Sequence, residues 1–423
     1  MDAITPRPHD CWVAGRAEPG EHTVAVTHPA DGTEVATVAV ASSDQVERAA
    51  DAASAAAGEL RRLPGAVRSA VLRAVADTLQ AQAEELAELV TAEAGTPLRW
   101  AEREVADAVA VLRAAAGHTT PPSGELRDGG ERTVLVRQVA RGPVLGVVGT
   151  HSPLRSAAHS VAAALAVGSP VVLAPALDTP LSALAVGEAL AGTDLPAGAF
   201  SVLPLGAAPV GDPRLPVVAG DTDPAPGATA VVLDWPDLAD AALRIAVSAT
   251  REAGRRPDAV HRVVVDESVA EEFVPALADA VRAQPTGDPY DLAVSVGPLP
   301  DEAAAQRAVR LLDDAVAAGA KLLTGGGRRG ATVEPALVTG TDPTAPVTGP
   351  ALAVVVTGSA DEAFAAVGGA QAGLFTREVR LAMRASEELP VEQLVVGDVP
   401  DYDPASVRAS MRAFTCERVT VLA

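Results

Sequence analysis

The stretch Pro143-Val-Leu-Gly-Val-Val148 decides the fold class, because every residue in it is apolar. A helical pattern follows at about 154–167, then the strand Val171-Val-Leu173, a helix at 179–191 and the strand Phe200-Ser-Val-Leu203. Short apolar strands that alternate with helices predict a parallel sheet that helices cover on both faces.

The same alternation returns in the second half of the chain. Ala230-Val-Val-Leu233 starts a unit that continues with a helix at 235–252, the strand His261-Arg-Val-Val-Val265 and a helix at 267–283. Further strands are expected at Lys321-Leu-Leu323, Ala351-Leu-Ala-Val-Val-Val356 and Gln393-Leu-Val-Val396. The chain is therefore predicted to be an α/β protein with two parallel-sheet units.

The segment before the first unit is predicted to be mostly helical. Two strands with alternating apolar residues come first, at 22–27 and 34–40, and Ser42-Ser43-Asp44 is typical of the cap of a following helix. Two more helices are expected at about 65–94 and 97–116, because Leu and Val recur there at helical spacing.

Composition excludes some classes of partner. The 423 residues suffice for two or three domains, and 48% apolar residues suffice for substantial cores. The net charge of −22 repels phosphate backbones and anionic lipids, so no nucleic-acid or membrane partner is expected. The region Ala157–Leu177 is interrupted by His159 and Pro170 and does not fit a membrane span, and the N-terminus has no secretory pattern. A cytoplasmic location is expected.

Cysteine and histidine give no metal site. The two cysteines, Cys11 and Cys416, lie near opposite ends of the chain and form neither a disulfide framework nor a CxxC motif. Each is expected to be a small buried or half-buried thiol. His151 and His159 flank a helix start and could face one pocket, but further ligands are lacking, so no metal site is predicted.

An ordered series of short motifs gives a resemblance to a known family. Gly142-Pro143-Val-Leu-Gly146-Val-Val-Gly149 is similar to PLGVVG, and Ala163–Pro175 is similar to PALAAGNTVVLKP. Leu195-Pro196-Ala-Gly198, Gly287-Asp288-Pro289 and Gly319-Ala320-Lys321 then follow in family order. From about residue 12 to its C-terminus the chain resembles the aldehyde dehydrogenase superfamily, as a shortened and divergent member that lacks the catalytic cysteine.

The resemblance implies an aldehyde-dehydrogenase-like α/β fold, with two Rossmann-like parallel-sheet domains and a small β oligomerisation flap. The implied division is a nucleotide-binding-like domain at 1–117 and 141–245, a catalytic-like domain at 246–392, and bridging strands within 118–140 and 393–423.

The family's nucleophile is missing from its expected position. Family members attack the aldehyde with a cysteine thiolate in an AGQxC motif. Ala253-Gly254-Arg255-Arg256-Pro257 aligns with this motif and places Pro257 at the nucleophile position. No cysteine lies between residues 12 and 415, so no shift of register restores the thiol. Asp258 and His261 are the nearest substitutes, and the preferred interpretation is that each is a solvated residue at a strand start.

Two further catalytic positions also differ from the family. Ser152-Pro153-Leu154-Arg155 occupies the place of TPWNFP but lacks the asparagine that holds the oxyanion. Arg155 could bind an anion there, although an arginine that faces water in the first turn of a helix is the preferred interpretation. Asp223 stands at the position of the family's glutamate base. The preferred interpretation is that Asp223 is only a turn residue, in a loop rich in Pro and Gly.

The family's cofactor contacts are replaced as well. Ala174 stands at the lysine position, Leu177 at an acidic position, and Pro346 at the glutamate that orients the nicotinamide ribose. The GSTEVG loop and its helix are missing after Val217–Gly220, so no helix start is expected to face a pyrophosphate. No cofactor is therefore predicted.

Because the scaffold positions match and the cleft positions do not, the preferred hypothesis is a non-catalytic protein, a pseudoenzyme that acts as a structural or regulatory subunit. It would form homo-oligomers, or hetero-oligomers with an active aldehyde dehydrogenase, through its flap strands. The alternative is an NAD(P)-linked aldehyde oxidoreductase or another small-metabolite enzyme with a non-cysteine mechanism, using Asp223, Arg155 or His151. A second alternative is a small-ligand sensor.

Overall fold

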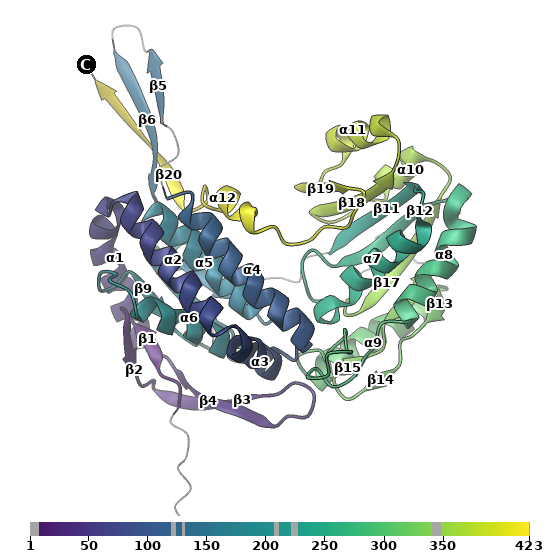
Figure 1. The fold of residues 1–423 in the computed structure, drawn as a ribbon, viewed down its shortest axis with the longest axis horizontal. Helices are drawn as coiled ribbons and strands as arrows, with labels where there is room; N and C mark the ends of the chain where they lie inside the picture. The colour runs from purple at the N-terminus through teal and green to yellow at the C-terminus, as the bar shows by residue number, and fades with distance from the viewer. Residues whose placement is uncertain are drawn as a thin grey trace, which may run out of the picture.

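Two large parallel-rich sheets organise the chain, and helices pack against both of them (Figure 1). The computed structural model describes residues 8–119, 124–128, 132–206, 211–220, 227–340 and 348–422. The α/β class with two parallel-sheet units and a small β flap is confirmed.

The first sheet has the strand order β10-β7-β8-β9-β1-β2. Its strands are β7 (Val144–Val148), β8 (Val171–Pro175), β9 (Phe200–Val202), β10 (Val217–Gly220), β1 (Cys11–Val13) and β2 (Arg16–Glu18). The first four run parallel, whereas β1 pairs antiparallel with β9 and β2. Every residue of β8 is buried, as expected for a strand with both faces covered.

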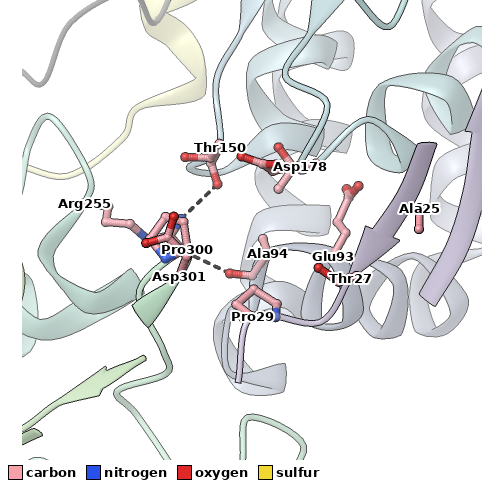
Figure 2. A pocket seen from close by; sticks show the side chains of 11 residues that line it. Ala25, Thr27, Pro29, Glu93, Ala94, Thr150, Asp178, Arg255, Pro300 and Asp301 are labelled. Carbon is pink, nitrogen blue, oxygen red and sulfur yellow. Dashed lines mark hydrogen bonds between the residues drawn. The ribbon is translucent and has the colours of Figure 1, made fainter. Parts of the chain in front are cut away.

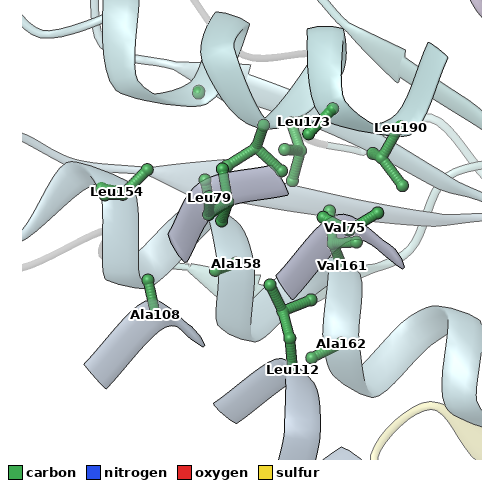
Figure 3. Packing of buried hydrophobic residues seen from close by; sticks show 14 of the residues in the cluster. Val75, Leu79, Ala108, Leu112, Leu154, Ala158, Val161, Ala162, Leu173 and Leu190 are labelled. Atoms are coloured by element: carbon green, nitrogen blue, oxygen red, sulfur yellow. The ribbon is translucent and has the colours of Figure 1, made fainter. Parts of the chain in front are cut away.

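Six helices accompany this sheet: α1 (Ser43–Arg62), α2 (Gly65–Ala81), α3 (Ala83–Ala94), α4 (Leu98–Ala116), α5 (Pro153–Val167) and α6 (Leu181–Ala191). The single helix expected at 65–94 is two helices, because the backbone leaves helical angles at Gln82. Figure 3 shows Leu79 and Leu112 packed among Ala108, Ala158 and Ala162. Alanine lets these helices approach closely, so a core with few aromatics can still be dense.

The second sheet has the order β13-β16-β17-β12-β11-β18-β19, and only β13 runs antiparallel to its neighbour. Its strands are β11 (Ala228–Asp234), β12 (Val260–Asp266), β13 (Lys321–Thr324), β16 (Ala336–Thr339), β17 (Ala351–Thr357), β18 (Gln371–Thr376) and β19 (Gln393–Val396). The accompanying helices are α7 (Leu238–Thr250), α8 (Glu267–Arg282), α9 (Glu302–Ala317), α10 (Ala360–Ala365) and α11 (Val379–Glu388). Strands β11 and β19 join this sheet, although the expected boundaries place β11 in the nucleotide-binding-like domain and β19 in the bridging segment.

A three-stranded flap extends away from the first sheet (Figure 1). Its strands are β5 (Glu125–Asp128), β6 (Thr133–Ala140) and β20 (Thr415–Leu422). β6 and β20 pair antiparallel along their whole length, from Thr133 opposite Leu422 to Ala140 opposite Thr415. The remaining elements are the hairpins β3 (His22–Thr27) with β4 (Glu34–Val40) and β14 (Arg328–Arg329) with β15 (Thr332–Val333), the turns η1 (Arg251–Gly254) and η2 (Pro404–Ser406), and α12 (Val407–Ser410).

The connections around β10 are short for a doubly wound sheet. Residues 203–216 join β9 to β10, and residues 221–227 join β10 to β11. No helix occurs among the residues of these two connections that the structure describes. None of the helices in the described ranges combines the length and the hydrophobicity that a membrane span requires.

Candidate active site between the two sheets

Strained backbone marks the place where the two halves of the molecule meet. Glu252 and Ala253, in η1, have φ values of 53° and 54°, and Ser152, at the start of α5, has a φ of 41°. Among the described residues other than glycine, only Ala14 shares this left-handed conformation. Such residues cost about 1–3 kcal/mol each and gather at functional sites, so this meeting point is the first candidate for a reaction centre.

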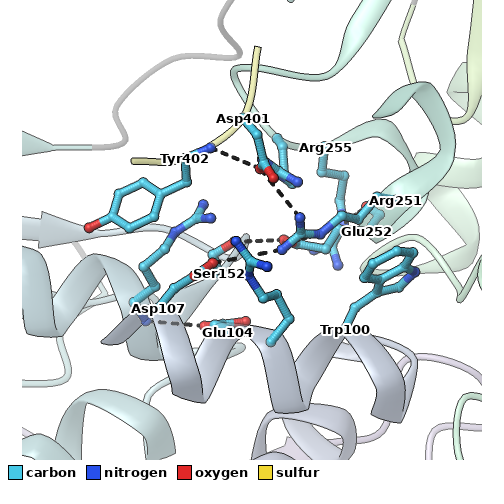
Figure 4. Close-up of polar contacts among 12 residues, drawn as sticks. Trp100, Glu104, Asp107, Ser152, Arg251, Glu252, Arg255, Asp401 and Tyr402 are labelled. Carbon is cyan, nitrogen blue, oxygen red and sulfur yellow. Dashed lines mark hydrogen bonds and ion pairs between the residues drawn. The ribbon is translucent and has the colours of Figure 1, made fainter. Parts of the chain in front are cut away.

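Ser152 and Glu252 bring these two strained segments into contact. The Ser152 hydroxyl donates a hydrogen bond of 2.8 Å to Glu252 Oε2, and both side chains are buried. Ser152 follows β7 and Glu252 follows α7, so the hydrogen bond links the first sheet's domain to the second (Figure 4). A hydroxyl held against a buried carboxylate has the arrangement of a nucleophile with its base.

A second carboxylate, Glu104 of α4, contacts the first turn of α5, directly after Ser152. Glu104 Oε1 accepts hydrogen bonds from the backbone N–H groups of Leu154 at 2.8 Å and Arg155 at 3.2 Å. Burial, and then the negative charge of Glu252, raise the pKa of Glu104 to about 8. Two interacting carboxyls that titrate far apart are typical of acid–base chemistry.

Guanidinium groups keep Glu252 ionised. Burial on its own would raise the pKa of Glu252, but the positive charges of Arg155, Arg256 and Arg251 outweigh burial and lower the pKa to about 2. His151 adds a smaller effect in the same direction, so this histidine lies within electrostatic reach of Glu252.

Aromatic rings hold the arginines in place. The Arg155 guanidinium lies 4.5 Å from the centre of the Tyr402 ring, and that of Arg251 lies 4.9 Å from the centre of the Trp100 ring. His159 contacts the Tyr402 hydroxyl at 2.9 Å through Nδ1. Burial, and then Arg155, lower the pKa of His159 to about 4, so its ring is neutral at physiological pH. Each of these contacts restricts where a guanidinium can point.

This cluster contains many polar atoms that lack hydrogen-bond partners. The described chain has twelve buried side-chain nitrogen or oxygen atoms of this kind, and six of them lie here: Glu104 Oε2, Asp107 Oδ2, Arg155 Nη1, Arg251 Nε, Arg251 Nη2 and Glu252 Oε1. Four of the six form two long ion pairs of 3.9 Å, Arg251 Nη2 with Asp107 Oδ2 and Arg251 Nε with Glu252 Oε1. Glu104 Oε2 and Arg155 Nη1 are the two that remain to be explained, because native proteins leave few such atoms unpaired. A polar substrate or bound water beside these two atoms would provide their partners.

The expected substitutes for the nucleophile are engaged in structural contacts. Pro257 is half-buried and carries no reactive group. Asp258 was expected to face water but is buried and paired with Arg256, with Nε to Oδ1 at 2.8 Å. His261 is buried too, and its Nε2 lies 2.8 Å from the Gly254 carbonyl oxygen. The solvated interpretation of both residues is wrong, because the η1 turn folds over this strand start.

Arg155 corrects a second expectation. It was expected to face water from the first helical turn, yet only 5% of it is exposed, because Tyr402 covers it. Ser152 and Arg155, the two residues assigned to the oxyanion region, do lie in the same cluster as Glu252. Sequence reasoning missed Glu104 and Glu252. Glu104 had a usable signal, since it falls on the buried stripe of α4 formed by Ala101, Val105 and Ala108.

The family's contacts to the nucleotide do not fit this chain. Ala174, at the lysine position, is 3% exposed and packs in an apolar cluster with Leu145, Val172 and Leu203. Leu177 is half-buried and cannot bind ribose hydroxyls. Asp223 and Pro346 lie outside the described residues. A nucleotide would therefore have to be held without the family's lysine and acidic side chains.

A pocket of about 130 Å³ lies near this site, between the starts of α5 and α6 and the second domain (Figure 2). Arg255 crosses it and donates hydrogen bonds to the carbonyl oxygens of Thr150 at 3.0 Å and Ala94 at 3.1 Å. Glu93, Asp178 and Asp301 make the lining acidic, which is unfavourable for a phosphate. This pocket therefore suits a small uncharged molecule better than a nucleotide.

The two thiols lie away from the cluster. Cys11 in β1 is fully buried, as expected, and burial raises its pKa to about 11. Cys416 in β20 is exposed, so the expectation of a buried or half-buried thiol is wrong there; the flap sheet leaves this face uncovered. Across the described ranges, no three His, Cys, Asp or Glu side chains are grouped so that they could hold a metal ion.

Comparison with known proteins identifies the class. Residues 12–215 and 227–410 match the aldehyde dehydrogenase family. The chain is 31% identical to 3,6-anhydro-alpha-L-galactose dehydrogenase of Streptomyces coelicolor, over 91% of this chain and 87% of that protein. It is 29% identical to 3-sulfolactaldehyde dehydrogenase of Priestia aryabhattai, over 87% and 85% of the two chains. The chain belongs to the aldehyde dehydrogenase family.

Solved structures agree with this assignment. Aldehyde dehydrogenase 21 of Physcomitrella patens, in complex with the reaction product succinate, superposes with a TM-score of 0.93 and 28% identity over 99% of both chains. The NADP-dependent glyceraldehyde-3-phosphate dehydrogenase of Bacillus halodurans, complexed with NADP, gives a TM-score of 0.88 and 26% identity over 98% of this chain and 99% of that one.

These findings correct three expectations. The hypothesis of a non-catalytic structural or regulatory subunit is contradicted, because the relatives are named as active aldehyde dehydrogenases. The interpretation as a pseudoenzyme is contradicted on the same ground. The expectation of no cofactor is contradicted by the similar enzyme of Bacillus halodurans, which is NADP-dependent and complexed with NADP. Sequence reasoning gave too much weight to replaced motif residues and too little to the full-length match.

Proposed function

We propose that the chain is an NAD(P)-linked aldehyde oxidoreductase that oxidises a small polar aldehyde without a cysteine nucleophile. The observation that carries this proposal is the buried Ser152–Glu252 pair, which sits at the family's catalytic motifs in a chain that matches the family over nearly its full length. The only cysteines are Cys11 and Cys416, one buried in β1 and the other on the flap.

The charge of the cluster supports a polar substrate. Arg155 Nη1 and Glu104 Oε2 are buried and have no hydrogen-bond partner, and Arg251 pairs with Asp107 and Glu252 only at 3.9 Å. An aldehyde that carries hydroxyl or anionic groups can pair with such atoms, whereas a purely hydrocarbon aldehyde would leave them unsatisfied. The named substrates of the relatives, sulfolactaldehyde and anhydrogalactose, are polar aldehydes of this kind.

NAD(P) would supply the hydride acceptor for such an oxidation. The residues at Ala174 and Leu177 do not reproduce the family's nucleotide contacts, so we expect NAD(P) to bind more weakly than in relatives that keep the lysine. Calorimetry with NAD and NADP measures this affinity directly.

The direct test is NAD(P)H formation, followed by absorbance, with the purified full chain and a panel of aldehydes. The panel includes an anionic, a hydroxylated and an aromatic aldehyde. We expect turnover with the first two and little with the third. Absence of turnover with the whole panel, at saturating NAD and NADP, would overturn the proposal.

We also propose that the chain forms homo-oligomers through its flap. β20 exposes Val419, Val421 and Leu422, and β5 exposes Leu126, on a sheet that packs on little else. Exposed apolar strands of this kind add to a partner's sheet. Light scattering checks this, and charged substitutions such as Val419→Glu with Val421→Glu should yield monomers.

A further inference from the structure

The hydroxyl of Ser152 does not cap the helix that follows it, although its position is that of a capping residue. Ser152 is the N-cap residue of α5, where a serine side chain usually accepts a hydrogen bond from the backbone of the first turn. Ser42, Asp237 and Asp301 do this at α1, α7 and α9. Ser152 does not, because Glu104 takes the N–H groups of Leu154 and Arg155. Its hydroxyl is left to donate to Glu252.

We propose that Ser152 is the nucleophile that adds to the substrate carbonyl, that Glu252 accepts its proton, and that Arg155 holds the resulting oxyanion. This inference rests on the proposed function, and it names the residues that replace the thiolate. The hydrogen bond of 2.8 Å between Ser152 Oγ and Glu252 Oε2 sets the path of the proton. The arginines that lower the pKa of Glu252 to about 2 make it a weak base before the attack. The oxyanion that forms beside Arg155 neutralises part of this positive charge, so Glu252 holds the proton more strongly as the new bond forms.

Arg155 has the properties that an oxyanion holder needs. Its Nη1 is buried without a hydrogen-bond partner, and the Tyr402 ring fixes the plane of the guanidinium. His159 in turn holds the Tyr402 hydroxyl. A preorganised cation with a free donor, in a site from which water is excluded, stabilises developing negative charge more strongly than the same group in solution.

The addition step balances without any further reactant. A bond forms between Ser152 Oγ and the carbonyl carbon, the Oγ proton moves to Glu252, and the π electrons move to the carbonyl oxygen beside Arg155. With an aryl ester in place of the aldehyde, the same attack forms an acyl-serine. The bond between the acyl carbon and the aryloxy oxygen then breaks, and the aryloxide takes the proton from Glu252 and leaves as the phenol.

Ser182 provides a matched control within the same chain. It too is a buried serine near a helix start, its hydroxyl donates to the buried Glu93, and its backbone N–H donates to that carboxylate at 2.9 Å. Both oxygens of Glu93 accept hydrogen bonds, and its pKa is raised by burial against the opposing effect of the hydrogen bonds from Ser182 and Leu181. Ser182 is therefore expected to be inert, although its local chemistry looks similar.

The test is acylation by p-nitrophenyl acetate, with the modified residue mapped by peptide mass spectrometry. We expect an acetyl group on Ser152, formed at least about 100-fold more slowly in Glu252→Gln, absent from Ser152→Ala, and unchanged in Ser182→Ala. Ser152→Cys keeps the inference testable if Ser152→Ala does not fold, because its thiol should be acylated at the same position.

Acetylation confined to Lys321, the only lysine, or to the N-terminal amine would overturn the inference, as would wild-type acylation in Ser152→Ala. Because acylation needs neither aldehyde nor NAD(P), the two proposals can fail separately. NAD(P)H formation that persists in a folded Ser152→Ala variant rejects Ser152 and leaves the oxidoreductase standing. Acylation of Ser152 in a protein that oxidises no aldehyde would support Ser152 as a nucleophile and reject the oxidoreductase.

Discussion

A buried glutamate from a neighbouring helix caps the start of both α5 and α6, but the two glutamates differ in the hydrogen bonds that they form. At α6, Glu93 of α3 accepts from the N–H groups of Leu181 at 2.7 Å and Ser182 at 2.9 Å. At α5, Glu104 of α4 accepts from the N–H groups of Leu154 and Arg155. Both carboxylates are buried and both satisfy the first turn of a helix that follows a parallel strand.

The difference lies in how many oxygens each cap uses. Glu93 uses both, one for each N–H group, and also binds the Ser182 hydroxyl. Glu104 uses only Oε1, and its Oε2 remains unpaired beside the charged cluster. At the start of α6, both carboxylate oxygens are therefore hydrogen-bonded. At the start of α5, one carboxylate oxygen has no partner, and the Ser152 hydroxyl donates to Glu252 instead of capping the helix. A buried glutamate that caps a helix start can thus stabilise the fold in one place and leave groups available for a reaction in another.

Glu252→Gln should give the largest effect on this comparison. The substitution keeps the shape of the side chain but removes the proton acceptor for Ser152, so the rate of aldehyde oxidation should fall by about 100- to 1000-fold. Steady-state kinetics measure the loss, and a thermal melt checks that the variant folds. A rate within threefold of wild type would show that Glu252 is only a structural partner of Ser152.

Glu93→Gln should act on stability instead of activity. A glutamine amide can place one oxygen but must turn its NH₂ group toward the other backbone N–H, so one buried donor loses its acceptor. The free energy of unfolding should fall by about 1–3 kcal/mol. Chemical denaturation measures it, and the activity per folded molecule should remain at the wild-type level. An activity loss as deep as in Glu252→Gln would abolish the contrast between the two caps.

Glu104→Gln should have the smallest effect at neutral pH, because one amide oxygen can still accept both N–H groups. The substitution should change how the activity depends on pH. Since the pKa of Glu104 is about 8, ionisation above that pH adds a negative charge beside Glu252 and increases its affinity for the Ser152 proton. Wild-type activity should therefore rise through pH 8, and the rise should be absent from the variant.

The pH dependence of the free energy of unfolding is a second measurement on Glu104→Gln. A carboxyl whose pKa is higher in the folded chain than its ordinary value of 4.5 stabilises the fold least when it is ionised. Stability that wild type loses between about pH 4.5 and 8 should thus be partly retained by Glu104→Gln. The charged groups that act on this carboxyl, and therefore also influence the profile, are Glu252 and Arg155. Equal pH profiles for both proteins would show that Glu104 does not titrate in this range.

The sequence predicted the scaffold well, because the scaffold depends on local patterns. Apolar runs such as Val144–Val148 and Val171–Pro175 are buried strands wherever they occur between helices. It did not reveal β1, β16 or β18, which are short or lack a distinctive pattern and become strands only through their neighbours.

The candidate site was only partly predictable. Ser152 and Arg155 follow a recognisable motif, whereas the importance of Glu252 depends on a left-handed turn and on contacts 100 residues away in sequence. The absence of the family cysteine was read as an absence of activity, and that inference does not follow when other groups can attack a carbonyl.

A cysteine-free variant, Cys11→Ala with Cys416→Ser, shows whether the oxidation of the aldehyde needs a thiol. The measurement is the initial rate of aldehyde-dependent NAD(P)H formation, compared with wild type under identical conditions. We expect equal rates, because the proposed reaction centre contains no sulfur. A rate that disappears with the thiols, or no NAD(P)H from wild type itself, would contradict the proposed function.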